Sequence, residues 1–129
     1  MENLEYSAKI AIVKVLMDIL NADDIVRDSE LEYINEVVKS FNLAETYNQD
    51  LTRMSTLQAL SIIRELSDSL KSNIAQMMGK MIIIDKDINY NEVKLYNAFC
   101  ESCKIASDFD MKDYSGYTLS GPFMNPEDL

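Results

Sequence analysis

The stretch Ala22-Asp23-Asp24-Ile25-Val26-Arg27-Asp28-Ser29-Glu30 lies between two segments whose apolar residues repeat with the period of an α-helix. A weaker copy follows at Ile84-Asp85-Lys86-Asp87-Ile88-Asn89-Tyr90-Asn91-Glu92. Both stretches are acidic, and an apolar helical segment precedes each one and an amphipathic segment follows it. The sequence therefore predicts two helix–acidic loop–helix units that are organised around these loops.

The two units form a repeat. Asp23 and Asp85 are separated by 85 − 23 = 62 positions, and this offset maps residues 8–44 onto residues 70–106. Apolar residues keep their register under the offset, as in Leu20 onto Ile82, Val26 onto Ile88 and Leu31 onto Val93. We expect an all-α fold, a compact bundle of about six or seven helices spanning residues 1–107, with residues 45–69 as a helical insert.

Periodicity and capping signals place the individual helices at about residues 4–21, 28–41, 44–54, 55–66, 69–84 and 89–104. Ser29-x-x-Glu32 and Ser55-x-x-Gln58 fit capping boxes, and Asn89 is a suitable cap with Glu92 three residues later. The segment Met81–Ile84 could form a strand, but the helical period runs into it from Leu70, so we assign it to a helix.

Several apolar residues are expected to face the core. Val26 and Ile88 would anchor the two loops, and Leu31 and Leu57 belong to inward helical stripes. The tail, residues 108–129, contains both prolines and all glycines except Gly79. It should be irregular, and it either packs across the bundle or frays. Its candidate packing residues are Phe109, Tyr114, Tyr117 and Phe123.

The charge composition indicates which classes of partner the chain can bind. The chain has 12 basic and 22 acidic residues, a net charge of −10, so it is a poor candidate for binding nucleic acid or an anionic membrane surface. Cations and basic protein surfaces are better candidates. The N-terminus is acidic, and Lys9, Lys14 and Asp18 interrupt the apolar run behind it, so we expect neither a signal peptide nor insertion into a membrane.

The absence of histidine removes histidine-based acid–base chemistry and histidine metal ligands. Cys100 and Cys103 are the two cysteines, and so few cysteines fit a reducing cytosol better than a secreted scaffold. Cys100-x-x-Cys103 could be a redox pair or half of a zinc site, but no further thiol or histidine completes four ligands. The repeat maps both onto core positions, which favours buried thiols.

The acidic loops are the main candidate site. Hard cations prefer clustered oxygen ligands, and calcium takes about 6–8 of them. The loops are not EF-hands, because each lacks the glycine and the spacing of that motif. A structural role is also open, because acidic residues near a helix N-terminus complement the helix dipole. The candidate ligands are Asp23, Asp24, Glu30, Asp85, Asp87 and Glu92.

Two other features have alternative interpretations. Met77, Met78 and Met81 could form a flexible partner groove, but they lie at helical spacing and match core positions of the first unit, which favours core packing. The acidic and aromatic tail could be a docking peptide or a C-terminal wrap over the bundle.

The loop pattern Ala-Asp-x-x-Val-x-x-x-Glu resembles the TerB-like family of tellurite-resistance proteins, over roughly residues 4–106. In that family a glycine usually follows the aspartate, whereas this chain has Asp24 and Lys86 there. The resemblance implies an all-α fold and a bacterial cytoplasmic protein linked to tellurite or other chemical stress. It also implies protein partners, some at the inner face of the membrane, and a proposed cation-binding acidic surface.

These observations lead to one main functional hypothesis and two alternatives. The main one is a non-enzymatic, TerB-like binding module whose acidic loops meet a divalent cation such as calcium or a basic partner. The first alternative is an interaction scaffold in which the loops only start helices and recognition uses the tail or an apolar groove. The second is an enzyme with a carboxylate pair, for which the sequence supplies no motif.

Overall fold

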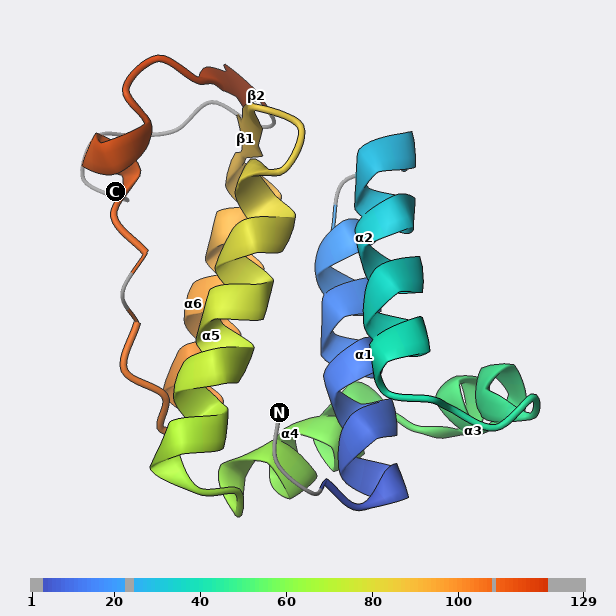
Figure 1. The fold of residues 1–129 in the computed structure, drawn as a ribbon. Helices are drawn as coiled ribbons and strands as arrows, with labels where there is room; N and C mark the ends of the chain where they lie inside the picture. The colour runs from blue at the N-terminus through green and yellow to red at the C-terminus, as the bar shows by residue number, and fades with distance from the viewer. Residues whose placement is uncertain (1–3, 23–24, 108, 121–129) are drawn as a thin grey trace.

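The computed structural model describes residues 4–22, 25–107 and 109–120. Over these residues the chain forms six α-helices, a 3₁₀ helix and a two-stranded sheet (Figure 1). The all-α prediction is therefore confirmed, with a small sheet as an addition. In chain order the elements are α1 (Tyr6–Leu20), α2 (Asp28–Ser40), α3 (Tyr47–Arg53), α4 (Thr56–Arg64), α5 (Asp68–Ile83), β1 (Asp87–Asn89), α6 (Tyr90–Cys103), η1 (Met111–Tyr114) and β2 (Thr118–Ser120).

Helix α1 is the centre of the bundle, and α2, α3, α4, α5 and α6 all pack against it. Its sequence is apolar around most of its circumference, so it can be covered on several sides. Ala11, Ile12, Leu16 and Ile19 are fully buried along it. Each such aliphatic side chain contributes about 1.5–3 kcal/mol by leaving water, which makes α1 the main source of core stability.

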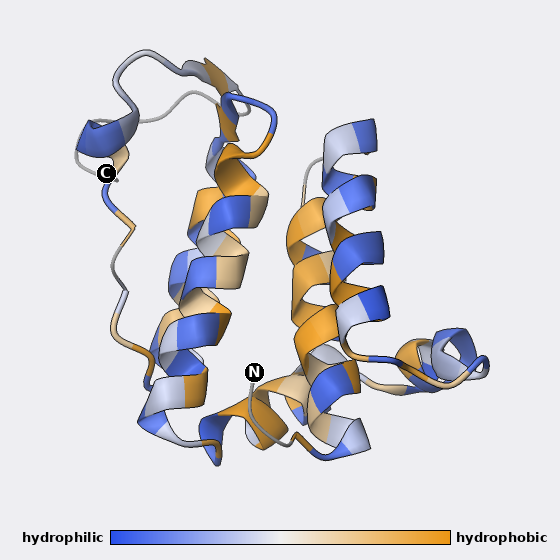
Figure 2. Cartoon of the chain, viewed as in Figure 1, coloured by the Kyte–Doolittle hydropathy of each residue, from blue (hydrophilic) through white to orange (hydrophobic). Residues whose placement is uncertain are grey.

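The two helix–loop–helix units stand side by side as the pairs α1/α2 and α5/α6, and α3 and α4 lie at one end (Figure 1). Figure 2 shows a long apolar stretch along α1, whereas α2 is mainly hydrophilic. This contrast agrees with burial, because α2 buries Tyr33, Ile34 and Val37 but leaves Leu31 40% exposed. The prediction that Leu31 faces the core is wrong, because α2 packs mainly along one side of α1.

Three of the six α-helices, α4, α5 and α6, start at a capping side chain. Ser55 forms the predicted capping box with Gln58, in which the Gln58 amide donates to Ser55 Oγ at 3.1 Å and the Ser55 amide donates to Gln58 Oε1 at 2.8 Å. Ser67 caps α5 and Asn89 caps α6. The Ser29–Glu32 box does not form, because α2 begins at Asp28 with Arg27 as its N-cap residue and Ser29 lies already inside the first turn.

The C-terminal segment is less irregular than predicted. Strand β2 pairs in parallel with β1, and the register places Leu119 opposite Ile88. Phe109, Tyr114 and Tyr117 pack on the core, with the Phe109 ring 5.7 Å from that of Tyr96 and 5.3 Å from that of Tyr114. Residues 109–120 therefore wrap over α5 and α6, while Phe123 lies outside the described residues.

Candidate functional site

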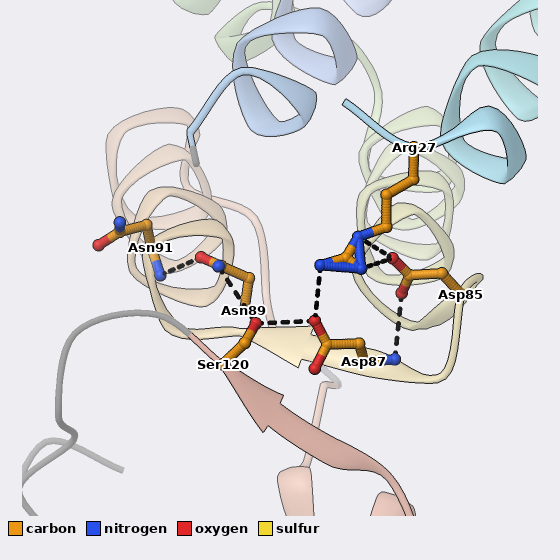
Figure 3. A network of polar contacts seen from close by, with 6 residues as sticks. All are labelled: Arg27, Asp85, Asp87, Asn89, Asn91 and Ser120. Atoms are coloured by element: carbon orange, nitrogen blue, oxygen red, sulfur yellow. Dashed lines mark hydrogen bonds and ion pairs between the residues drawn. The ribbon is translucent and has the colours of Figure 1, made fainter. Parts of the chain in front are cut away.

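An arginine from the first unit joins the two acidic loops. Arg27 Nε lies 3.0 Å from Asp85 Oδ2, and Arg27 Nη2 lies 3.0 Å from Asp87 Oδ2 (Figure 3). Arg27 Nη1 also donates to Asp85 Oδ2 at 3.1 Å. A planar guanidinium presents several donors in fixed directions, so a single arginine can bridge two carboxylates. The positive charge between Asp85 and Asp87 is thus supplied by the chain itself.

The C-terminal segment completes this network, which we call the Arg27 clamp and define as Arg27, Asp85, Asp87, Asn89 and Ser120. Ser120 Oγ donates to Asp87 Oδ2 at 2.7 Å and accepts from Asn89 Nδ2 at 3.3 Å (Figure 3). The clamp therefore links three separate parts of the sequence, namely the loop before α2, the loop after α5, and β2. The Asp85 and Asp87 side chains are only 14% exposed.

The second loop turns at Lys86, whose φ of 61° lies in the left-handed region. Asp85 stabilises this turn, because its Oδ1 accepts the Asp87 amide at 3.1 Å. The Lys86 carbonyl then accepts the amide of Thr118 at 3.2 Å. A non-glycine residue adopts this backbone at a cost of about 1–2 kcal/mol, so Lys86 stands where glycine fits best.

Two glutamates occupy corresponding positions in the units. Glu30 is the third residue of α2 and Glu92 is the third residue of α6, and they are 1% and 3% exposed. Both lie in the first helical turn, where a negative charge complements the helix dipole. This placement agrees with the interpretation of the loops as helix starts, and it extends the repeat from apolar residues to buried charged ones.

The predicted cation ligands are therefore only partly brought together. Asp85 and Asp87 converge, but on Arg27 rather than on an open space. Within the described ranges, no group of three or more carboxylates or thiols is arranged to hold a metal ion. Asp23 and Asp24 lie outside the described residues, so a cation site at the first loop stays a prediction.

A different surface feature is an apolar groove at the far end of the bundle from the clamp, between the start of α1, α3 and α4. It has a volume of about 670 Å³ and is open to solvent. A second hollow of about 550 Å³ continues it toward α5, and the two share Ser7, Ser61 and Ile62. We call the combined feature the α1–α4 groove. Its main apolar lining residues are Tyr6, Ile10, Met54, Leu57, Ile62 and Leu66.

Leu57 is the most conspicuous residue of this groove, because its side chain is 77% exposed. The sequence predicted it to face inward. Helix α4 instead buries Ala59 and Ile63 and presents Leu57 on its outer side, because a stripe wider than the contact leaves one edge in water. Exposed apolar residues beside a hollow are typical of interaction sites, whereas isolated ones are common on any surface.

The rim of the groove is mainly acidic. Glu5, Asp50 and Glu65 line it, with Arg53 as the basic exception. The Tyr6 hydroxyl donates to Asp50 Oδ2 at 2.5 Å, and this hydrogen bond raises the pKa of Tyr6. The tyrosine thus stays neutral and holds the start of α1 against α3.

Cys100 and Cys103 are buried free thiols, as the repeat predicts for core positions. Burial raises the pKa of Cys103 although Lys71 and Arg64 lower it in part, and burial followed by the charge of Glu36 raises the pKa of Tyr33. The Cys103 thiol is therefore not activated as a nucleophile, since that requires a lowered pKa and access to solvent. Met78 and Met81 are buried and Met77 is partly buried, which fits core packing.

Sequence reasoning missed Arg27 and Ser120 as members of one network. The signal for Arg27 was the presence of a basic residue in an otherwise acidic loop, at a position where the repeat has Asn89. Ser120 gave no comparable signal, because its role depends on the return of the tail to β1.

Comparison with known proteins bears on the fold alone. No known family model matches the sequence, and no curated protein matches it. The structure is similar to the crystal structure of a protein of unknown function from Porphyromonas gingivalis W83, with a TM-score of 0.70 and 17% sequence identity. The match covers 90% of this chain and 96% of that one. In the part of the chain that the structure describes, no helix has the length and apolar character to cross a membrane.

Proposed function

We propose that this chain is a non-enzymatic protein-interaction module that holds a basic amphipathic helix of a partner in the α1–α4 groove. The observation that carries the proposal is the open groove itself, with Leu57 exposed in its wall. Helix-in-groove recognition uses apolar anchors that repeat every three to four residues along the partner. The resemblance to the TerB-like family supports a bacterial, cytoplasmic, stress-associated setting for such a module.

The acidic rim of the groove favours a basic partner. Glu5, Asp50 and Glu65 outnumber Arg53 along the groove, and the whole chain carries a net charge of −10. Complementary charge raises the association rate and disfavours acidic partners. A helix with leucines on one face and lysines or arginines beside them therefore fits this groove better than an acidic helix of the same shape.

The second acidic loop is a weaker candidate for the recognition surface. Arg27 already pairs with Asp85 and Asp87, so a basic partner would have to displace an intramolecular arginine. Displacement would leave that guanidinium to be solvated again and would break its charge-assisted hydrogen bonds, which are worth about 1.5–3 kcal/mol each. The proposal thus corresponds to the scaffold alternative, in which the second loop has a structural role.

Fluorescence anisotropy with synthetic helical peptides tests the proposal. The probe carries leucines at i, i+3 and i+7 with flanking lysines, and a second probe replaces each lysine by glutamate. We expect the basic probe to bind, and Leu57→Ser to weaken it by about tenfold or more. The matched control is Leu119→Ser, because Leu119 is also an exposed leucine but lies on β2. Equal binding of both probes, or equal loss in both variants, would refute the groove proposal.

A further inference from the structure

The charges along the α1–α4 groove are unevenly distributed. Its larger hollow adjoins α3 and the first half of α4, and the charged residues among its described lining are Asp50 and Arg53. Its smaller hollow adjoins the end of α4 and the start of α5, and there the charged lining residues are Glu5 and Glu65. The formal charges therefore cancel in the larger hollow, whereas the smaller hollow is doubly negative.

The two hollows follow one another along α4. Leu57, in the first turn of α4, lines the larger hollow, Ile62 lines both, and Glu65, the C-cap residue, lines the smaller one. Figure 1 shows α4 at one end of the bundle, between α3 and the start of α5. A partner helix that fills both hollows therefore lies along α4, and it can run in the same direction as α4 or in the opposite one.

The four charged side chains are not equally open to a partner. Asp50 is only partly exposed, and it accepts the hydroxyl of Tyr6, which holds it at the wall of the groove. Arg53, the last residue of α3, is exposed, and so are Glu5 and Glu65. Exposed charges add little to stability, because water and salt screen them. They do steer an approaching partner and fix its register on the surface.

The partner helix has a polarity of its own. An α-helix carries partial positive charge at its N-terminus and partial negative charge at its C-terminus. The N-terminal end is therefore better placed beside Glu5 and Glu65, and the C-terminal end beside Arg53. Lysines in the N-terminal half strengthen this preference, whereas lysines in the C-terminal half oppose it, because they would meet another cation at Arg53.

We propose that the partner helix lies antiparallel to α4. Its N-terminal half is basic and covers the smaller hollow beside Glu5 and Glu65, and its C-terminal half is uncharged and packs its apolar anchors in the larger hollow beside Leu57. This inference rests on the proposed function, because it specifies the direction of the helix that the groove holds. The groove thus favours one direction of the partner as well as one sign of charge.

Paramagnetic relaxation enhancement in the nuclear magnetic resonance spectrum of the full chain measures this direction. The probe is a helical peptide with leucines at i, i+3 and i+7, lysines confined to its N-terminal half, blocked termini, and a nitroxide at one end or the other. The N-terminal nitroxide should broaden the amide signals of residues 65–70 more than those of residues 53–57, and the C-terminal nitroxide should do the opposite. The reverse pattern, or equal broadening of both ranges by each label, would overturn the proposed direction but not the groove. Broadening of neither range would overturn the proposed function, and this inference with it.

Two arginine variants test whether charge sets the direction. Arg53→Glu makes the larger hollow doubly negative as well, so each nitroxide should then broaden both ranges to a similar extent. The matched control is Arg64→Glu, because Arg64 is also exposed but is not among the residues that line the groove, and this variant should keep the direction. An unchanged direction in Arg53→Glu, or a lost direction in Arg64→Glu, would overturn the proposal.

A second peptide separates the direction of the helix from its total charge. It has the same composition, but its lysines lie in the C-terminal half, so its basic residues and its helix dipole favour opposite directions. We expect this peptide to bind about threefold more weakly than the first one in fluorescence anisotropy. Equal affinities of the two peptides would show that only total charge matters, and they would overturn the proposal.

Discussion

Val26 and Ile88 occupy corresponding positions in the two units, yet Val26 is 47% exposed and Ile88 is 0% exposed. Their neighbours explain the difference. Helix α6 packs against α1, α4, α5 and β1, whereas α2 packs mainly on α1. In addition, β2 covers the second loop. A repeated sequence pattern thus specifies the same local structure twice, while the packing environment decides which copy becomes core.

The largest expected effect is a difference in stability between substitutions at Ile88 and at Val26. Ile88→Ala removes fully buried methyl groups and leaves a cavity, so we expect a loss of about 3 kcal/mol in the free energy of unfolding. Val26→Ala should change that free energy by less than about 0.5 kcal/mol, as for most exposed sites. Urea denaturation of both variants measures the difference. Similar losses at the two positions would mean that the units are equally packed.

The next largest effect concerns the link between the loops. Arg27→Ala leaves Asp85 and Asp87 close together without their shared cation, so we expect a loss of about 2 kcal/mol. Arg53→Ala is the control, because Arg53 is exposed and removes no such link. A double-mutant cycle of Arg27→Ala with Asp87→Asn should give a clear coupling energy. A loss no larger than that of Arg53→Ala would contradict the clamp.

A smaller effect tests the turn of the second loop. Lys86→Gly should be more stable than Lys86→Ala by about 1 kcal/mol, because alanine retains the strain of a positive φ and glycine does not. Lys39→Gly, in α2, should instead destabilise the protein by about 1 kcal/mol, because glycine is unfavourable inside a helix. Thermal unfolding compares the three variants. If glycine destabilised the protein at position 86 as it does at position 39, the turn at Lys86 would not be strained.

The smallest expected effect concerns calcium. Isothermal titration calorimetry of Asp85→Ala should give the same calcium heat as the unaltered chain, because Arg27 already neutralises Asp85. Any weak calcium binding should be lost in Asp23→Ala, because the first loop remains the candidate cation site. Loss of heat in Asp85→Ala with none in Asp23→Ala would reverse this assignment of the two loops.

The helices and the repeat could be predicted because they depend on local periodicity and short capping motifs, as at Ser55 and Asn89. The clamp could not be predicted, because it joins residues 58 and 33 positions apart in the sequence. The exposure of Leu57 and Leu31 escaped prediction for a related reason. Periodicity shows which side of a helix is apolar, but only the arrangement of the other helices shows how much of that side is covered.

The sequence separations within the clamp also have a kinetic consequence. Contacts between distant residues form only after long segments of chain have been ordered, so their formation comes late in folding. An interaction that is absent from the transition state affects the rate of unfolding rather than the rate of folding. Arg27 should therefore act mainly on the lifetime of the folded state. Arg27→Ala should leave the folding rate nearly unchanged and shorten the lifetime of the folded state.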